Sequence, residues 1–196
     1  MKKYVELTES ERAIDRFLHT VNPEDPASIN AGLNLLNTIG AVQQGLAKYR
    51  LTAGQMSIDQ LETEKHSSER MARHMIAAGK VKRHLCHAHA IVSGGHDEAL
   101  DIRGLLAFLK LRIDDPDNGC WLPSNTASRP QSSYPRGVPH SRIHRWNYYF
   151  WLKTKLNMVR IKDIEALRSQ LRLIENQLQV STMPDFVMMK KKEGIA

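Results

Sequence analysis

The stretch NGCWLPSNTASRPQSSYPRGVPHSRIHRWNYYFWLKTKLNMVRIK (residues 118–162) gives this chain its character. It contains no Asp or Glu, and its rings include Trp121, Tyr134, Trp146 and Trp151. Its cations are Arg129, Arg136, Arg142, Arg145, Lys153, Lys155, Arg160 and Lys162. Cations neutralise phosphates while rings pack on sugars or bases, so this composition favours a nucleic-acid surface. The alternative is a solvated basic helix face above ordinary core aromatics.

The charge of the chain is unevenly distributed. The 196 residues carry a net charge of +7 with a pI near 9.5, yet residues 1–64 are net −3 and residues 65–196 are net +10. An acidic head before a basic body indicates a polyanionic partner for the body. Basic proteins of membrane surfaces share this balance, so charge alone does not decide between the two.

The sequence carries no sign of secretion or of a membrane span. Cys86 and Cys120 are too few for a disulfide framework, which fits a reducing compartment. No apolar run approaches the ~18 residues of a membrane-spanning helix, and the first residues lack the apolar segment of a signal peptide. We expect a soluble cytoplasmic protein associated with the nucleoid.

Apolar spacing predicts a mainly α fold. Near the C-terminus, apolar residues alternate by three and four positions, the a/d seam of a coiled coil. They are Ile164, Leu167, Leu171, Ile174 and Leu178. We therefore expect a helix-turn-helix or winged-helix-like N-terminal part, a small β-hairpin, and a long C-terminal helix that forms a homodimer.

A helix-turn-helix candidate lies in SIDQLETEKHSSERMARHMIAAGKVKRHL (residues 57–85). The order is short helix, tight turn, second helix, Gly79 and then a possible strand up to Val92. This order resembles winged-helix DNA-binding proteins over residues 57–92. The resemblance implies that the early residues of the second helix enter the major groove of DNA. An ordinary helical corner with a polar outer side is the alternative.

Two groups of side chains are the predicted DNA contacts. Around the second helix, Arg donates to guanine and Lys contacts phosphate; in the basic stretch, cations follow the backbone. The residues are Ser68, Arg70, Arg73, His74, Lys80, Lys82, Arg83, Arg129, Arg136, Arg142, Arg145, Lys153 and Lys155.

Histidines and a cysteine form a candidate metal site. His140 and His144 lie one helical turn apart, and thiolate with imidazole suits Zn²⁺. A mixed site of Cys86, His89, His140 and His144 is chemically reasonable. However, no paired C-x-x-C exists, and on a strand Cys86 faces away from His89. These patterns favour scattered polar histidines with no resident metal.

A second resemblance covers residues 111–150. Leu111–Asp114, Asn118–Leu122, Tyr134–Gly137 and Ile143–Tyr148 resemble the opening half of phage-type HNH endonuclease domains. Those domains begin with a Gly-Cys-Trp strand, a hairpin and a His-Arg helix, and their metal-binding half follows. Here no His comes after His144. The resemblance therefore implies a DNA-holding scaffold without its catalytic half.

Together these patterns predict a double-stranded DNA-binding protein that reads DNA through two modules. We expect a helical domain over 1–110, a basic aromatic HNH-like remnant over 111–155, a coiled-coil helix over 156–180 and a flexible tail over 181–196. The favoured function is a transcription regulator of a phage or other mobile element, without catalytic residues. The alternatives are a metal-dependent HNH-like endonuclease and an adaptor for a protein such as RNA polymerase. RNA in place of DNA stays open.

Overall fold

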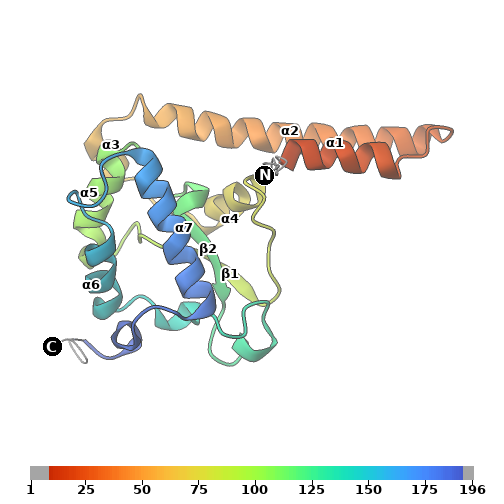
Figure 1. The fold of residues 1–196 in the computed structure, drawn as a ribbon. Helices are drawn as coiled ribbons and strands as arrows, with labels where there is room; N and C mark the ends of the chain where they lie inside the picture. Colours follow the sequence, from red (N-terminus) through yellow and green to blue (C-terminus); the bar gives the residue numbers. More distant parts are fainter. Residues whose placement is uncertain (1–8, 192–196) are drawn as a thin grey trace, which may run out of the picture.

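The computed structural model describes residues 9–191. In this part the chain is mainly helical, with one antiparallel sheet of two strands (Figure 1). The prediction of a mainly helical fold is confirmed. None of the helices described is long and apolar enough to cross a membrane.

A helical hairpin opens the chain and extends beyond the rest of the molecule (Figure 1). It consists of α1 (Glu9–Thr20) and α2 (Pro26–Ala53). Asp25 accepts a hydrogen bond from the backbone of Ala27, and Pro26 takes the first helical position, where its missing N–H costs nothing. Only the second half of α2 contributes buried side chains, namely Leu46, Tyr49 and Ala53. The hairpin is therefore fastened to the molecule by one end of α2.

The two helices of the predicted helix-turn-helix are present. They are α3 (Ile58–Glu62), with a capping box between Ser57 and Gln60, and α4 (Ser68–Ala77), capped by Ser67. Helix α4 lies across the sheet so closely that a Cβ on Gly119 would come within 2.7 Å of the Met75 sulfur. The inner face of α4 is thus committed to the sheet.

The strands are not a winged-helix hairpin. Strand β1 (Cys86–Ala90) pairs with β2 (Gly119–Pro123), and His89 lies opposite Cys120. Helix α5 (Leu100–Phe108) separates the two strands along the chain. The expected wing over 81–92 is therefore not shown, because its strand pairs across a long connection rather than with a neighbour in sequence.

The main core gathers around two C-terminal helices, α6 (Trp146–Lys155) and α7 (Ile164–Val180). Trp151, Tyr148 and Leu152 of α6 are buried in it with residues of α5 and β2. Four seam residues of α7 have no solvent exposure and belong to the same cluster: Leu167, Leu171, Ile174 and Leu178. These residues pack into the chain's own core and are not available to a second copy. The reasoning that predicted a coiled-coil homodimer from this seam was therefore wrong. The proposed domain boundaries stay predictions.

An acidic turn before β2 joins distant helices through ion pairs. Asp115, at 1 % exposure, accepts from Arg50 of α2 at 2.9 Å and from Arg168 of α7 at 3.3 Å. Asp117 also pairs with Arg168. Burial raises the pKa of Asp115, but Arg50 and Arg168 outweigh it and hold the pKa below its ordinary value. The turn thus fixes α2 and α7 to the start of β2.

Removing this carboxylate should destabilise the fold strongly. In Asp115→Ala, Arg50 and Arg168 lose a buried partner, which costs ~3–5 kcal/mol for a broken buried pair. Urea denaturation measures the loss of unfolding free energy. Asp101→Ala is the control, because Asp101 pairs with Lys153 at 75 % side-chain exposure, and exposed pairs contribute less than ~1 kcal/mol. Equal losses in both variants would contradict the role given to the turn.

Candidate metal centre

His89 is placed by the alternation of β1. Successive strand side chains point to opposite faces, so Cys86 and Ala90 pack against Met71 and Met75 while His89 points into the other side. There His89 has no solvent exposure. A fully buried imidazole needs partners for its polar nitrogens.

His140 and His144 come from the segment between the sheet and α6. His140 opens a 3-10 turn over His140–Arg142, and α6 begins only at Trp146, so the expected helix from His140 is interrupted. His140 is half-buried and His144 is exposed. The short turn still brings both rings onto the same side as His89.

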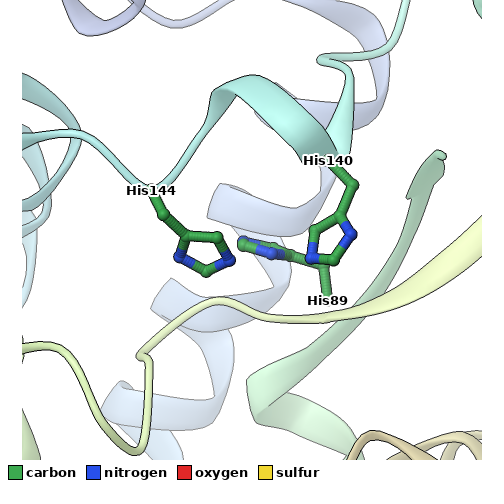
Figure 2. A group of neighbouring side chains, drawn as sticks. All are labelled: His89, His140 and His144. Carbon is green, nitrogen blue, oxygen red and sulfur yellow. The ribbon is translucent and has the colours of Figure 1, made fainter. Parts of the chain in front are cut away.

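The three imidazoles converge (Figure 2). Ring centroids lie 5.2 Å apart for His89 and His140, 5.0 Å for His89 and His144, and 5.5 Å for His140 and His144. One ligand nitrogen from each ring lies within 4.8 Å of the other two. Three nitrogen ligands with an open side are the arrangement of catalytic Zn²⁺ sites, in which water or substrate takes the remaining position.

The hydrogen bonds of the site leave a ligand atom free. The Nε2 of His89 faces the Tyr148 hydroxyl at 3.4 Å, and that hydroxyl donates to the Ile91 carbonyl at 2.8 Å. The Nδ1 of His89 is buried without a hydrogen-bond partner. The Nδ1 of His144 meets the Tyr149 hydroxyl at 2.9 Å, which leaves Nε2 of His144 for another partner. An orphaned buried nitrogen beside two further imidazoles fits a divalent cation.

The histidines are held in the neutral form that a metal requires. Burial, then the neighbouring rings, lowers the pKa of His89 well below its ordinary value. Although His144 is exposed as a whole residue, partial burial of its ring and then His140 lower its pKa from 6.5 to about 4. The pKa of His140 is lowered as well, again mainly by burial. Neutral imidazoles offer lone pairs at neutral pH.

Cys86 does not belong to the centre. It faces the opposite side of β1, at 5 % exposure among Met71, Met75 and Trp121. Burial raises the pKa of its thiol, which disfavours the thiolate that metals bind. The inclusion of Cys86 in the candidate site was wrong, whereas His89, His140 and His144 are brought together. The convergence of the three rings corrects the expectation that these histidines are scattered.

Several predicted DNA contacts are engaged inside the molecule. Arg70 donates to buried Asp114 at 2.7 Å and to the Lys65 carbonyl at 2.6 Å. The Nδ1 of His74 bonds the Asp114 carbonyl at 2.8 Å. Lys80 pairs with Glu175 at 2.6 Å. The guanidinium of Arg70 is therefore engaged within the fold, and DNA reading through α4 stays a prediction from the sequence.

Elsewhere in the basic stretch, further predicted contacts have intramolecular partners. Lys153 pairs with Asp101, Arg129 donates to the Pro135 carbonyl, and Arg145 donates to the Met188 carbonyl. Arg83 interacts with Tyr134. Arg136 is exposed, and Lys155 is half-buried at the end of α6.

Two grooves carry the remaining predicted residues, and one of them reaches His140 of the centre. One groove, lined by Ser68, Arg73, Lys82, His87 and His140 among others, runs along the outer side of α4. The second is lined by His96, Arg142, Arg145, Trp146, Lys190 and Lys191 among others. Its His96 stacks on Tyr149, the partner of His144, with ring centroids 4.4 Å apart. Cations therefore line a groove at His140 and a second groove at His96.

Fold and site together define a small, mainly helical protein in which three histidine rings converge. Residues 70–179 match the model of the AHH family, described as a nuclease family of the HNH/ENDO VII superfamily with conserved AHH. The match spans more than half of the chain, and the chain belongs to this family. Searches of curated proteins and of solved structures found no match.

This membership corrects the main functional prediction. The transcription regulator is wrong, and the alternative of an HNH-like nuclease is the better reading, because the matched family is one of nucleases. The resemblance to HNH domains is confirmed, but the inference of a missing catalytic half is not. In the HNH domains that the sequence resembles, the metal ligands come after the position of His144. Here His89 comes from upstream in the chain, through the antiparallel pairing of β1 with β2.

The lowered pKa values predict an acid-sensitive apo fold. Between pH 6.5 and about 4, His144 is protonated in the unfolded chain but stays neutral in the folded one. The free energy of unfolding therefore falls as the pH is lowered through this range. Denaturant unfolding in EDTA at pH 7 and pH 4.5 should show this loss. His144→Gln should have a shallower dependence, and His19→Gln, on exposed α1, should match wild type. A slope for His144→Gln equal to that of wild type would contradict the assignment.

Proposed function

We propose that this protein is a metal-dependent endonuclease that hydrolyses phosphodiester bonds of double-stranded DNA. The observation that carries the proposal is the buried, unpartnered Nδ1 of His89 beside the rings of His140 and His144. Membership in a nuclease family supports it.

The residues of the centre would hold the cofactor, and neighbouring tyrosines would orient its ligands. His89, His140 and His144 would hold one divalent ion such as Zn²⁺ through neutral imidazoles. When bound, such an ion supplies a Lewis acid for the charge that develops on the scissile phosphate. Tyr148 and Tyr149 contact His89 and His144 through their hydroxyls, which fixes the orientation of both rings.

The grooves give the substrate its path. Arg73 and Lys82 are exposed beside His140 in one groove, and Arg142 is exposed in the other. Phosphates on either side of the scissile bond would pair with these cations, which position the backbone without reading its sequence. This arrangement supports a nuclease of low sequence specificity. A cytoplasmic, nucleoid-associated location stays a prediction from the sequence.

Loss of a metal ligand should abolish cleavage. We expect His89→Ala and His144→Ala to lose at least ~100-fold in the rate of plasmid nicking with Zn²⁺, Mn²⁺ or Mg²⁺, since the charge on the phosphate loses its stabilising ion. Bound metal, measured on the same samples, should fall with activity.

His84→Ala is the matched control. His84 is an exposed histidine before β1, and its backbone makes the hydrogen bonds that it contributes to the fold. It should nick DNA at the wild-type rate. Wild-type protein that binds a divalent ion and cleaves neither plasmid nor linear duplex would overturn the proposed function.

A further inference from the structure

A hydrogen-bonded pair, His66 and Asp114, lies beside the metal centre. His66 lies outside the segment that matches the family. The Nδ1 of His66 forms a short hydrogen bond to Asp114 Oδ1. Asp114 has no solvent exposure, and its other oxygen accepts from the Ser67 backbone at 3.0 Å and from Arg70 at 2.7 Å. The carboxylate is thus fixed from several sides. A fixed carboxylate on Nδ1 sets the tautomer of an imidazole and leaves its Nε2 as the free lone pair.

His66 lies near the three histidines. A Cβ added to Gly94 would come within 2.7 Å of the Cβ of His66, so the two residues are in close contact. Gly94 belongs to the connection that follows β1, the strand that carries His89. His66 is within electrostatic reach of His89, His140 and His144. Its side chain is 29 % exposed, so the ring is accessible to water and substrate.

The family tripeptide is incomplete in this chain. The family description names Ala-His-His, whereas Ala88-His89 is followed by Ala90, and no two histidines are adjacent anywhere in the sequence. Ala90 is buried under Met71 and Met75, at 5 % exposure. Hydrolysis still needs a group that takes a proton from the attacking water. In the proposed centre, the lone pairs of His89, His140 and His144 would be committed to the cation.

We propose that His66 is the general base of the hydrolysis, positioned by Asp114. This inference rests on the proposed function. Water attacks the phosphorus and gives its proton to Nε2 of His66, while the P–O bond to the leaving sugar breaks. The leaving oxygen takes a proton from solvent. The imidazolium faces the Asp114 carboxylate until it returns its proton to solvent.

Two other histidines near the centre are less suited to this role. The Nδ1 of His96 accepts a hydrogen bond from the Glu98 backbone as a helix cap. His87 packs edge-on to His140 with centroids 5.9 Å apart and is exposed. Neither has a carboxylate on its ring among the contacts of the described residues. Both serve as competing candidates in the test.

The test compares His66→Ala, His87→Ala and His96→Ala as metal-loaded proteins on a duplex oligonucleotide and on thymidine 5′-p-nitrophenyl phosphate. His66→Ala should lose about 100-fold in kcat, within the range for general-base catalysis, with metal content and KM unchanged. The loss should persist on the p-nitrophenyl ester, because a good leaving group replaces a general acid but not a base. Added imidazole should restore activity to His66→Ala.

Each outcome has a distinct meaning. Wild-type rates for His66→Ala, or a loss confined to KM, overturn the role of His66 while the nuclease stands. A loss that disappears on the p-nitrophenyl ester makes His66 an acid rather than a base. A larger loss in His87→Ala or His96→Ala assigns the base there. If metal-loaded wild type hydrolyses neither substrate, the proposed function fails, and the role of His66 fails with it.

Discussion

The acidic turn of Asp114, Asp115 and Asp117 is the constraint on which the structure depends. These carboxylates come directly before β2 and bind basic groups from three helices: Arg50 of α2, Arg70 of α4 and Arg168 of α7. Such buried pairs are specific in geometry because each unpaired charge would be costly. The turn therefore sets where β2 starts, and with it the register that places His89 opposite Cys120. The same turn supplies the carboxylate that holds His66.

Burial determines the chemistry of the metal centre. A ring with no exposure, such as His89, is neutral because desolvation disfavours its charged form. The same burial leaves its Nδ1 without a partner, a cost that a bound cation removes. The empty site thus lowers the stability of the fold, especially at acidic pH. A bound divalent ion would remove this cost. This is the physical reason to regard the histidines as a centre rather than as packing.

Sequence reasoning succeeded where the signal was local. Helix caps at Ser57 and Ser67 and the opposite facing of Cys86 and His89 on a strand follow from near neighbours. The heptad seam of α7 was identified, but a seam has the same spacing whether a second copy or the chain's own core covers it. Its burial at Leu167 and Leu178 shows the latter.

The failures concern contacts that are distant in sequence. Arg70 was predicted to contact DNA because its partner, Asp114, lies 44 residues away. His66 was interpreted only as part of a turn, since nothing near it in sequence indicates a carboxylate. His89, His140 and His144 were considered together as ligands but were not favoured as a site, because the pairing of β1 with β2 has no local signal. Functional constellations of this kind are assembled by topology, which single-sequence patterns do not determine.

X-ray absorption at the zinc edge of the metal-loaded protein tests the three-histidine centre most directly. A centre of His89, His140 and His144 predicts one ion per chain, with three imidazole nitrogens at about 2.0–2.1 Å and no sulfur among its ligands. His89→Ala should then lose an imidazole or the ion itself. A sulfur shell at about 2.3 Å, or an unchanged spectrum in His89→Ala, would contradict the three-histidine centre.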